Sequence, residues 1–183
     1  MRPHINKISS AWFYHLRCLW QLRRLVDRAM MQCLVLASVI SRLNYCNSTL
    51  AGLPACALEP LQRVLHIAVR LVADLGPRDH VRGSMKDLHW LPIADRIKFK
   101  LCTLMHAAIF GHSLSYIRDL LVPVSEMKGR THLRSAAAEF YDVLFTQTQF
   151  GRRTFTVAAP SEWNSFPVNI TQIHDILDNL KQR

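Results

Sequence analysis

Basic side chains at helical spacings are the residues of this chain best suited to bind a ligand. One set consists of Lys7, Arg17, Arg24 and Arg28. On an ideal helix, these four side chains would fall within about a quarter of the circumference, opposite an apolar stripe. A second pair, Arg63 and Arg70, is seven residues apart and shares a face of a later predicted helix. Guanidinium rows suit phosphate oxygens because the planar fork can bind two of them at once.

The charge balance supports this interpretation. The chain has 183 residues, with Lys+Arg 23 against Asp+Glu 13 and a formal net charge of +10, half of it within residues 1–28. Such an excess favours a polyanionic partner. A row of arginines is also common as the solvated face of any helical bundle, and a membrane surface is disfavoured because the apolar faces are needed for the core. Second-rank phosphate contacts are predicted at Lys98, Lys100, Arg152 and Arg153.

Motifs for catalysis are absent from the sequence. It has no adjacent Asp-Asp pair, no P-loop, no G-x-G-x-x-G and no G-x-S-x-G. Cys102, His106 and His112 give the best metal-like spacing, but no fourth ligand follows, and a core cysteine beside surface histidines is favoured. We therefore expect no enzymatic activity, no cofactor and no metal site.

The elements that must position the cations read as helices. Apolar periodicity predicts helices over residues 5–26, 28–45 with Asp27 as the N-cap, about 59–75 with Pro60 in the first turn, 83–88, 93–110 closed by Gly111, and 115–121. The second is apolar nearly all round and is expected at the centre of a bundle. Trp12, Trp20, Trp90 and Trp163 are candidates for stacking on nucleic-acid bases. For Trp12, Trp90 and Trp163, packing in the interior is favoured instead.

The composition changes after Pro123. Residues 140–145 and 153–157 are rich in Phe, Tyr, Val and Thr and predict a β-hairpin, while residues 158–166 and 173–181 predict short helices. The expected fold is mainly α: a helical bundle over residues 1–123 and a small, irregular, partly β extension over residues 124–183.

The cysteines and the N-terminus predict an intracellular protein. The five cysteines form no C-x-x-C pair, and residues 1–4 lead into an amphipathic stretch instead of a signal peptide. The longest apolar run, residues 29–40, is short of the roughly 20 residues of a membrane span. We expect a cytoplasmic or nuclear protein that is not secreted.

Several segments, in order and in register, resemble the C-terminal part of the reverse transcriptase of LINE-type (non-LTR) retrotransposons of the jockey-like group. They are SRLNYCNSTLAGLP (41–54), LQRVLHIAVRLV (61–72), LHWLPIADRIKFKL (88–101), SYIRDLL (115–121) and FTVAAPSEWNSFP (155–167). The opening residues 3–25 resemble the family segment that follows the polymerase palm. His66-Ile67 departs from the family, which usually has Asn-Ala there.

The resemblance implies a thumb-like helical bundle that grips the template–primer backbone. The family's catalytic Tyr-x-Asp-Asp motif and its endonuclease have no counterpart in this sequence. The expected function is therefore that of a non-catalytic polymerase fragment binding RNA, DNA or their hybrid. Two alternatives stay open: a helical interaction scaffold that docks on a palm domain or on another copy, and a truncated remnant without a selected function.

Overall fold

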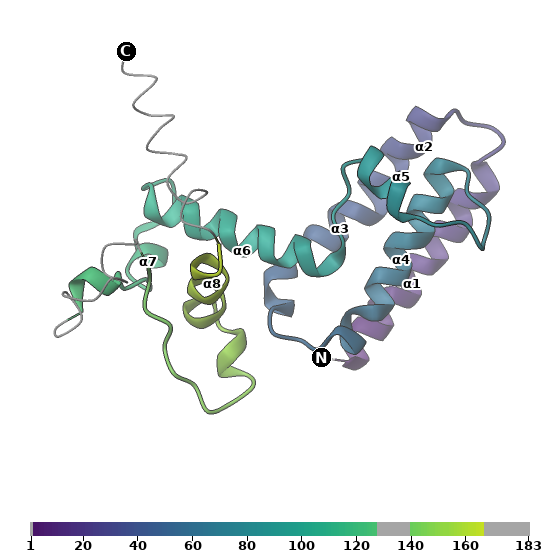
Figure 1. Cartoon of the computed structure of the whole chain (residues 1–183). Coiled ribbons are helices and arrows are strands. Elements are labelled where there is room, and N and C mark those ends of the chain that lie inside the picture. Colours follow the sequence, from purple (N-terminus) through teal and green to yellow (C-terminus); the bar gives the residue numbers. More distant parts are fainter. Residues whose placement is uncertain (1, 128–139, 167–183) are drawn as a thin grey trace, which may run out of the picture. The chain divides into compact units, whose positions relative to one another are not determined.

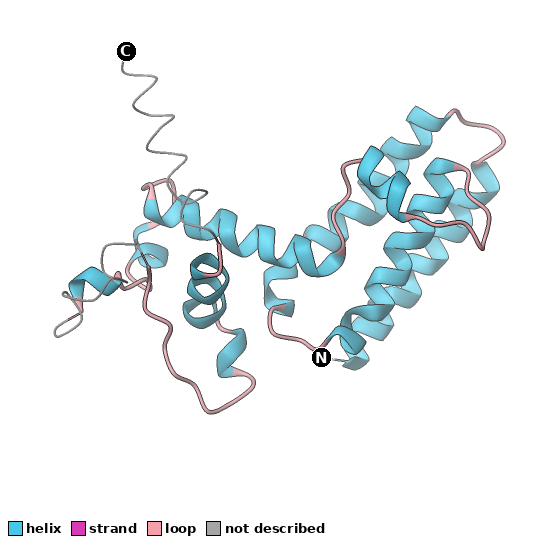
Figure 2. Cartoon of the chain, viewed as in Figure 1, coloured by secondary structure: helices cyan, strands magenta, loops and turns pink. Residues whose placement is uncertain are grey.

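The computed structural model describes residues 2–127 and 140–166, and these ranges are mainly α-helical, as predicted (Figures 1 and 2). The chain divides into two compact units, Met1–Ile97 and Lys98–Arg183. The predicted boundary between residues 123 and 124 lies inside the second unit. No helix in the described ranges is both long and apolar enough to cross a membrane.

The first unit is built on two long helices that pack side by side, α1 (Arg2–Leu22) and α4 (Ala55–Ala73) (Figure 1). The chain returns between them through α2 (Arg28–Val35) and α3 (Ser41–Asn44), and α2 contacts both long helices. The core face predicted for α4 is confirmed by its burial: Leu61, Val64, Leu65, Ala68, Leu71 and Val72. This apolar burial is the main source of stability for so amphipathic a set of helices.

The predicted second helix is interrupted by a wide turn. Between α2 and α3 lies a π-helical turn, η1 (Leu36–Ile40), closed by the Ser41 amide donating to the Leu36 carbonyl five residues earlier. The Ser41 hydroxyl donates to the Ala37 carbonyl at 2.6 Å, the acceptor that the Ser41 amide would use in an α-helix. Ser38 binds the Leu34 carbonyl in the same way, also at 2.6 Å. Both serine hydroxyls thus bond carbonyls of this segment, although the same bond from Ser9 in α1 leaves that helix regular.

The helical segment over residues 28–44 does not occupy the centre of the bundle, so the prediction that it would is wrong. Met30 is 53% exposed and Leu36 37% exposed, whereas Val64 and Leu65 in α4 are fully buried. The segment buries one stripe, and the rest of its apolar surface meets solvent. Helix α4 is the central element instead.

Two helix boundaries also differ from prediction. Helix α1 ends at Leu22 and not near Val26, because the Leu25 amide bonds the Leu22 carbonyl at 2.9 Å in a tight three-residue step. Helix α4 begins at Ala55, after the extended residue Pro54, so Pro60 lies inside the helix and not in its first turn. By contrast, the predicted Asp27 N-cap is confirmed, since its carboxylate accepts the Met30 amide at 3.0 Å.

The beginning of α6 (Ile93–Ile109) is fixed to earlier helices by polar contacts. Gln62 of α4 accepts the Ile93 amide at 2.9 Å. Arg96 donates to the Leu91 carbonyl at 2.7 Å and to the Asn44 side chain of α3 at 2.9 Å. The short helix α5 (Arg82–Asp87) precedes this junction, where Trp90 is buried as predicted.

The second unit holds the rest of α6 with α7 (Ser115–Arg118), η3 (Val124–Glu126), η5 (Gly151–Arg153) and α8 (Phe155–Asn164). Gly111 ends α6 with a left-handed φ of +74°, the conformation that favours glycine at a helix C-terminus. The Asn164 side chain bonds both backbone groups of Tyr141, accepting its amide at 3.1 Å and donating to its carbonyl at 2.8 Å.

The predicted hairpin is not formed in the described residues. Residues 140–145 make one isolated antiparallel bridge, Pro123 with Tyr141, and residues 155–157 begin α8. Burial of Val157, Ala158, Ala159 and Trp163 on one helix overrides the β-like composition at its start. The predicted terminal helix, residues 173–181, lies outside the described residues.

Candidate nucleic-acid interface

Helix α1 separates an apolar face from a basic one. Its buried positions are Ile5, Ser9, Trp12, Leu16 and Leu19. Its exposed positions recur at three- and four-residue spacings on another side of the helix: Lys7, Ser10, Tyr14, Arg17 and Gln21. Lys7 and Arg17 therefore stand on solvent with an exposed aromatic ring, Tyr14, between them.

Arg24 and Arg28 are not on the same helix face as Lys7 and Arg17, which corrects the predicted continuous row. Because α1 ends at Leu22, Arg24 lies in the connecting turn and Arg28 is the first residue of α2. All four cations are nevertheless exposed. We refer to Lys7, Arg17, Arg24 and Arg28 together as the basic set.

The basic set has no acidic partners within the described chain. The ion pairs there join Arg23 to Asp74, Arg63 to Glu59 and Lys98 to Glu162. None of the basic set takes part in these pairs or in a side-chain hydrogen bond among the described residues. An anion binding here would displace water and would not have to break a salt bridge.

Arg63 and Arg70 are engaged within the protein. The Arg63 guanidinium binds Glu59 one turn earlier, with Nε 3.1 Å from the carboxylate oxygen. Arg70 is half-buried and donates to the Asp79 carbonyl at 3.4 Å, while its buried Nε has no hydrogen-bond partner in the described structure. These two arginines share α4 but are less available to a ligand than the basic set.

The other predicted phosphate contacts belong to the second unit. Lys98 lies 3.6 Å from the Glu162 carboxylate. Lys100 and Arg152 are exposed, and the Arg153 guanidinium lies over the Phe150 ring, 5.9 Å from its centroid. They form a set separate from the cations of the first unit.

Two exposed aromatic residues lie near the basic set: Trp20, a stacking candidate from the sequence, and Tyr14, which the sequence analysis did not single out. Trp20 is 44% exposed, and the Arg23 guanidinium lies 5.0 Å from its ring centroid. Tyr14 is 65% exposed and lies three residues before Arg17. The spacing of Tyr14, Arg17 and Trp20, three residues apart, is the signal that could have placed them on one side of the helix.

The Cys102 region is occupied by packing interactions. Burial raises the pKa of the Cys102 thiol to about 11, and Glu162 adds to this while Lys98 opposes it. The His106 ring packs against Phe110, with centroids 4.4 Å apart. In the described ranges, no group of three or more His, Cys, Asp or Glu side chains could hold a metal ion.

The first unit thus offers cations for phosphate oxygens and exposed rings for stacking on bases. Phosphate contacts position a nucleic acid without reading its sequence, and ring stacking tolerates every base. Comparisons of the chain with protein-family models, with curated proteins and with solved structures give no match.

Proposed function

We propose that this chain binds the backbone of RNA, DNA or their hybrid through the basic set. The observation that carries the proposal is the exposure of Lys7, Arg17, Arg24 and Arg28 without acidic partners, in a chain of net charge +10. Exposed arginine and lysine side chains release counterions from a polyanion when they contact its phosphates. Binding by this route needs no catalytic group and has little sequence specificity.

Salt dependence tests the electrostatic mechanism. If all four cations contact phosphates, the slope of log K against log salt is about −2.8 to −3.6. Affinity for a labelled RNA–DNA hybrid then falls roughly 50- to 150-fold between 50 and 200 mM salt. Absence of binding at low salt, by a chain whose circular dichroism shows it to be folded, would overturn the proposal.

Charge reversal locates the interface. The double variant Arg17→Glu with Arg24→Glu should lose binding. For any binding that remains, the slope of log K against log salt should be shallower by the contribution of about two phosphate contacts. The matched control is Arg78→Glu with Arg82→Glu, which changes two other exposed arginines of the first unit by the same charge. Equal loss in both variants would show that net charge alone, and not the basic set, drives binding.

We also propose that the chain is a non-catalytic relative of the retrotransposon thumb that its sequence resembles. The support is the helical bundle formed by the segments that carry the resemblance, residues 41–54, 61–72 and 88–101. A thumb contacts a template–primer, so the hybrid is the substrate of choice in the binding experiment. Single strands and duplex DNA in parallel titrations measure the preference.

Exposed apolar side chains favour a second candidate, a helical interaction scaffold. In the second unit, Phe145 is 88% exposed, Phe150 75% and Leu114 64%. Where such exposed apolar side chains form one patch, the patch commonly marks a protein-binding site, such as one for a polymerase palm or another copy of the chain. Sedimentation equilibrium tests self-association. An oligomer that persists in the Arg17→Glu, Arg24→Glu variant would separate this role from nucleic-acid binding.

A further inference from the structure

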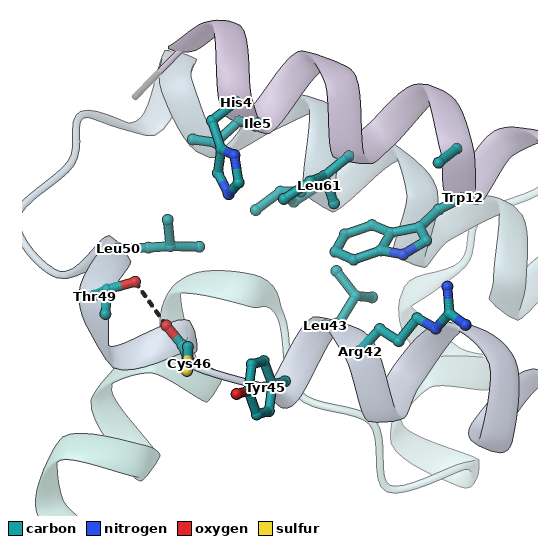
Figure 3. Close-up of a pocket in the computed structure, with 12 residues that line it drawn as sticks. His4, Ile5, Trp12, Arg42, Leu43, Tyr45, Cys46, Thr49, Leu50 and Leu61 are labelled. Carbon is teal, nitrogen blue, oxygen red and sulfur yellow. Dashed lines mark hydrogen bonds between the residues drawn. The ribbon is translucent and has the colours of Figure 1, made fainter.

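A cavity of about 600 Å³ opens in the first unit between α1, α4 and the segment that follows η1. Its apolar walls come from Ile5, Ile8, Trp12, Leu43, Leu50 and Leu61. Figure 3 shows Ile5, Trp12 and Leu61 on one side, with Leu43 and Leu50 facing them. The volume is within the range of small-molecule sites, which are typically about 300–1,000 Å³.

Arg42 is the charged side chain among the residues that line this cavity. Arg42 lines it and extends toward the Trp12 end, while His4 points into it from α1 (Figure 3). No Asp or Glu belongs to the lining, and Arg42 forms no ion pair or hydrogen bond among the described residues. A guanidinium beside an apolar cavity is suited to a ligand with an anionic head and an apolar body.

The π-helical turn η1 determines which of the residues after it line the cavity. Residues 42, 43, 45 and 46 all line the cavity, and all follow η1 directly. The Thr49 hydroxyl donates to the Cys46 carbonyl at 2.7 Å and closes the loop at the cavity mouth (Figure 3). π-Helical turns occur frequently at functional sites because they redirect the side chains that follow them.

We propose that the cavity binds an amphiphilic monoanion, with an aliphatic chain among the leucine and isoleucine side chains and its acid group on Arg42. Five branched aliphatic side chains line the cavity beside Trp12 and Tyr45, and this predominantly apolar lining suits an alkyl body. The lining residues include Arg42 and no carboxylate, which disfavours a cationic amphiphile. This site is separate from the basic set, so it stands or fails independently of nucleic-acid binding.

Calorimetric titration of the full chain with monomeric dodecanoate tests the proposal. We expect saturable binding of one dodecanoate per chain, with dodecanol weaker by about tenfold or more and dodecyltrimethylammonium weaker still. Dodecanoate should shift tryptophan emission to shorter wavelength, because its alkyl chain replaces water beside Trp12, and the shift should be lost in Trp12→Phe. Vesicles of anionic phospholipid form a separate arm, because binding to them without binding monomeric dodecanoate would overturn the cavity assignment.

Variants that should stay folded make the test specific. Arg42→Gln should weaken dodecanoate binding about tenfold or more. Ala11→Leu, at an exposed α1 position on the cavity lining, should block it by filling space. Arg78→Gln removes an exposed arginine outside the cavity and should leave binding unchanged. Unaltered affinity in both Arg42→Gln and Ala11→Leu would overturn the proposal.

Discussion

Cys102 is the side chain whose chemistry its surroundings change most clearly. Its thiol is half-buried, and its pKa is raised to about 11 by burial and by Glu162. At pH 8 only about one molecule in a thousand carries the thiolate, which is the reactive form. Cys18, Cys33 and Cys46 are exposed. We predict that iodoacetamide at pH 8 labels these three first and Cys102 last, as followed by peptide mass spectrometry.

Glu162→Gln provides the control for this prediction. The substitution removes the carboxylate that helps to raise the pKa of Cys102, so labelling of Cys102 should become faster. Labelling of Cys18, far from Glu162 in the chain, should not change. Rapid labelling of Cys102 in the unmodified protein would contradict the burial on which the argument depends.

His66 links the stability of the first unit to pH. Gln62 accepts the Ile93 amide with its oxygen, so its amide nitrogen, 2.7 Å from His66 Nε2, donates to a neutral imidazole. Burial lowers the pKa of His66 below its ordinary 6.5, and the charge of Arg70 lowers it further. The unfolded chain therefore binds the proton at a higher pH than the folded chain does. As the pH falls below about 6.5 toward the folded-state pKa, protonation of the unfolded chain lowers the free energy of unfolding.

Thermal unfolding checks this expectation. The fall in Tm between pH 7.5 and pH 5.5 should be smaller for His66→Gln than for the unmodified chain, because the variant cannot titrate at this position. An equal fall in both proteins would show that other histidines account for the pH dependence. The same comparison with Arg70→Gln should also reduce the fall, since it removes the second cause.

At the level of single residues, the sequence shows which positions are charged. It predicts less well which of these side chains have no partner inside the protein and are available to bind a ligand. Arg17 and Arg63 look alike in a helical wheel, but Arg63 has a carboxylate one turn earlier while Arg17 has none. Glu59 was visible in the sequence, and its four-residue spacing could have predicted that pair. The contact from Arg70 to the Asp79 carbonyl crosses a loop, so no local pattern reports it.

The N-terminus of α2 gives a prediction at the scale of elements. Asp27 caps the helix through one hydrogen bond to the Met30 amide. Asp27→Ala should lower the free energy of unfolding by about 1 kcal/mol, measured by urea denaturation. Asp27→Asn keeps the acceptor and should cost only a few tenths of that value. An equal loss in both variants would mean that the charge of Asp27, and not its acceptor oxygen, stabilises α2.

Which elements could be predicted depended on whether their signals are local. The Asp27 cap and the Gly111 terminus act within a few residues, and both predictions are confirmed. The hairpin failed because residues 155–157 are held in α8 by burial of a helical face, a tertiary effect that β-propensity cannot report. The wide turn η1 keeps the chain helical and changes only the spacing of its backbone hydrogen bonds, which apolar periodicity does not show.

The net charge of +10 governs behaviour at the scale of the whole molecule. The Arg63–Glu59 pair joins two exposed side chains at the surface, where such pairs contribute little. Repulsion among the remaining cations opposes the compact state and is screened by salt. We predict that Tm rises as sodium chloride increases from 10 to 200 mM, measured by differential scanning calorimetry.

The charge-reversal control tests the cause of this rise. Arg78→Glu with Arg82→Glu lowers the net charge by four and should flatten the dependence of Tm on salt. A Tm that falls with added salt in the unmodified chain would show that attractive pairs dominate instead. In low salt, a polyphosphate should raise Tm through mass action, because it binds the folded basic set.

The turn at Leu36–Ile40 holds one residue more than the same stretch of regular α-helix would. A single-codon deletion there would restore an ordinary helix and rotate every following side chain by about 100° about the axis. Leu43 would leave the core, and Arg42 would leave the cavity that it now lines. One residue of chain length thus determines the cavity lining, and related sequences that keep or lack this residue are expected to differ at the cavity while sharing α1 and α4.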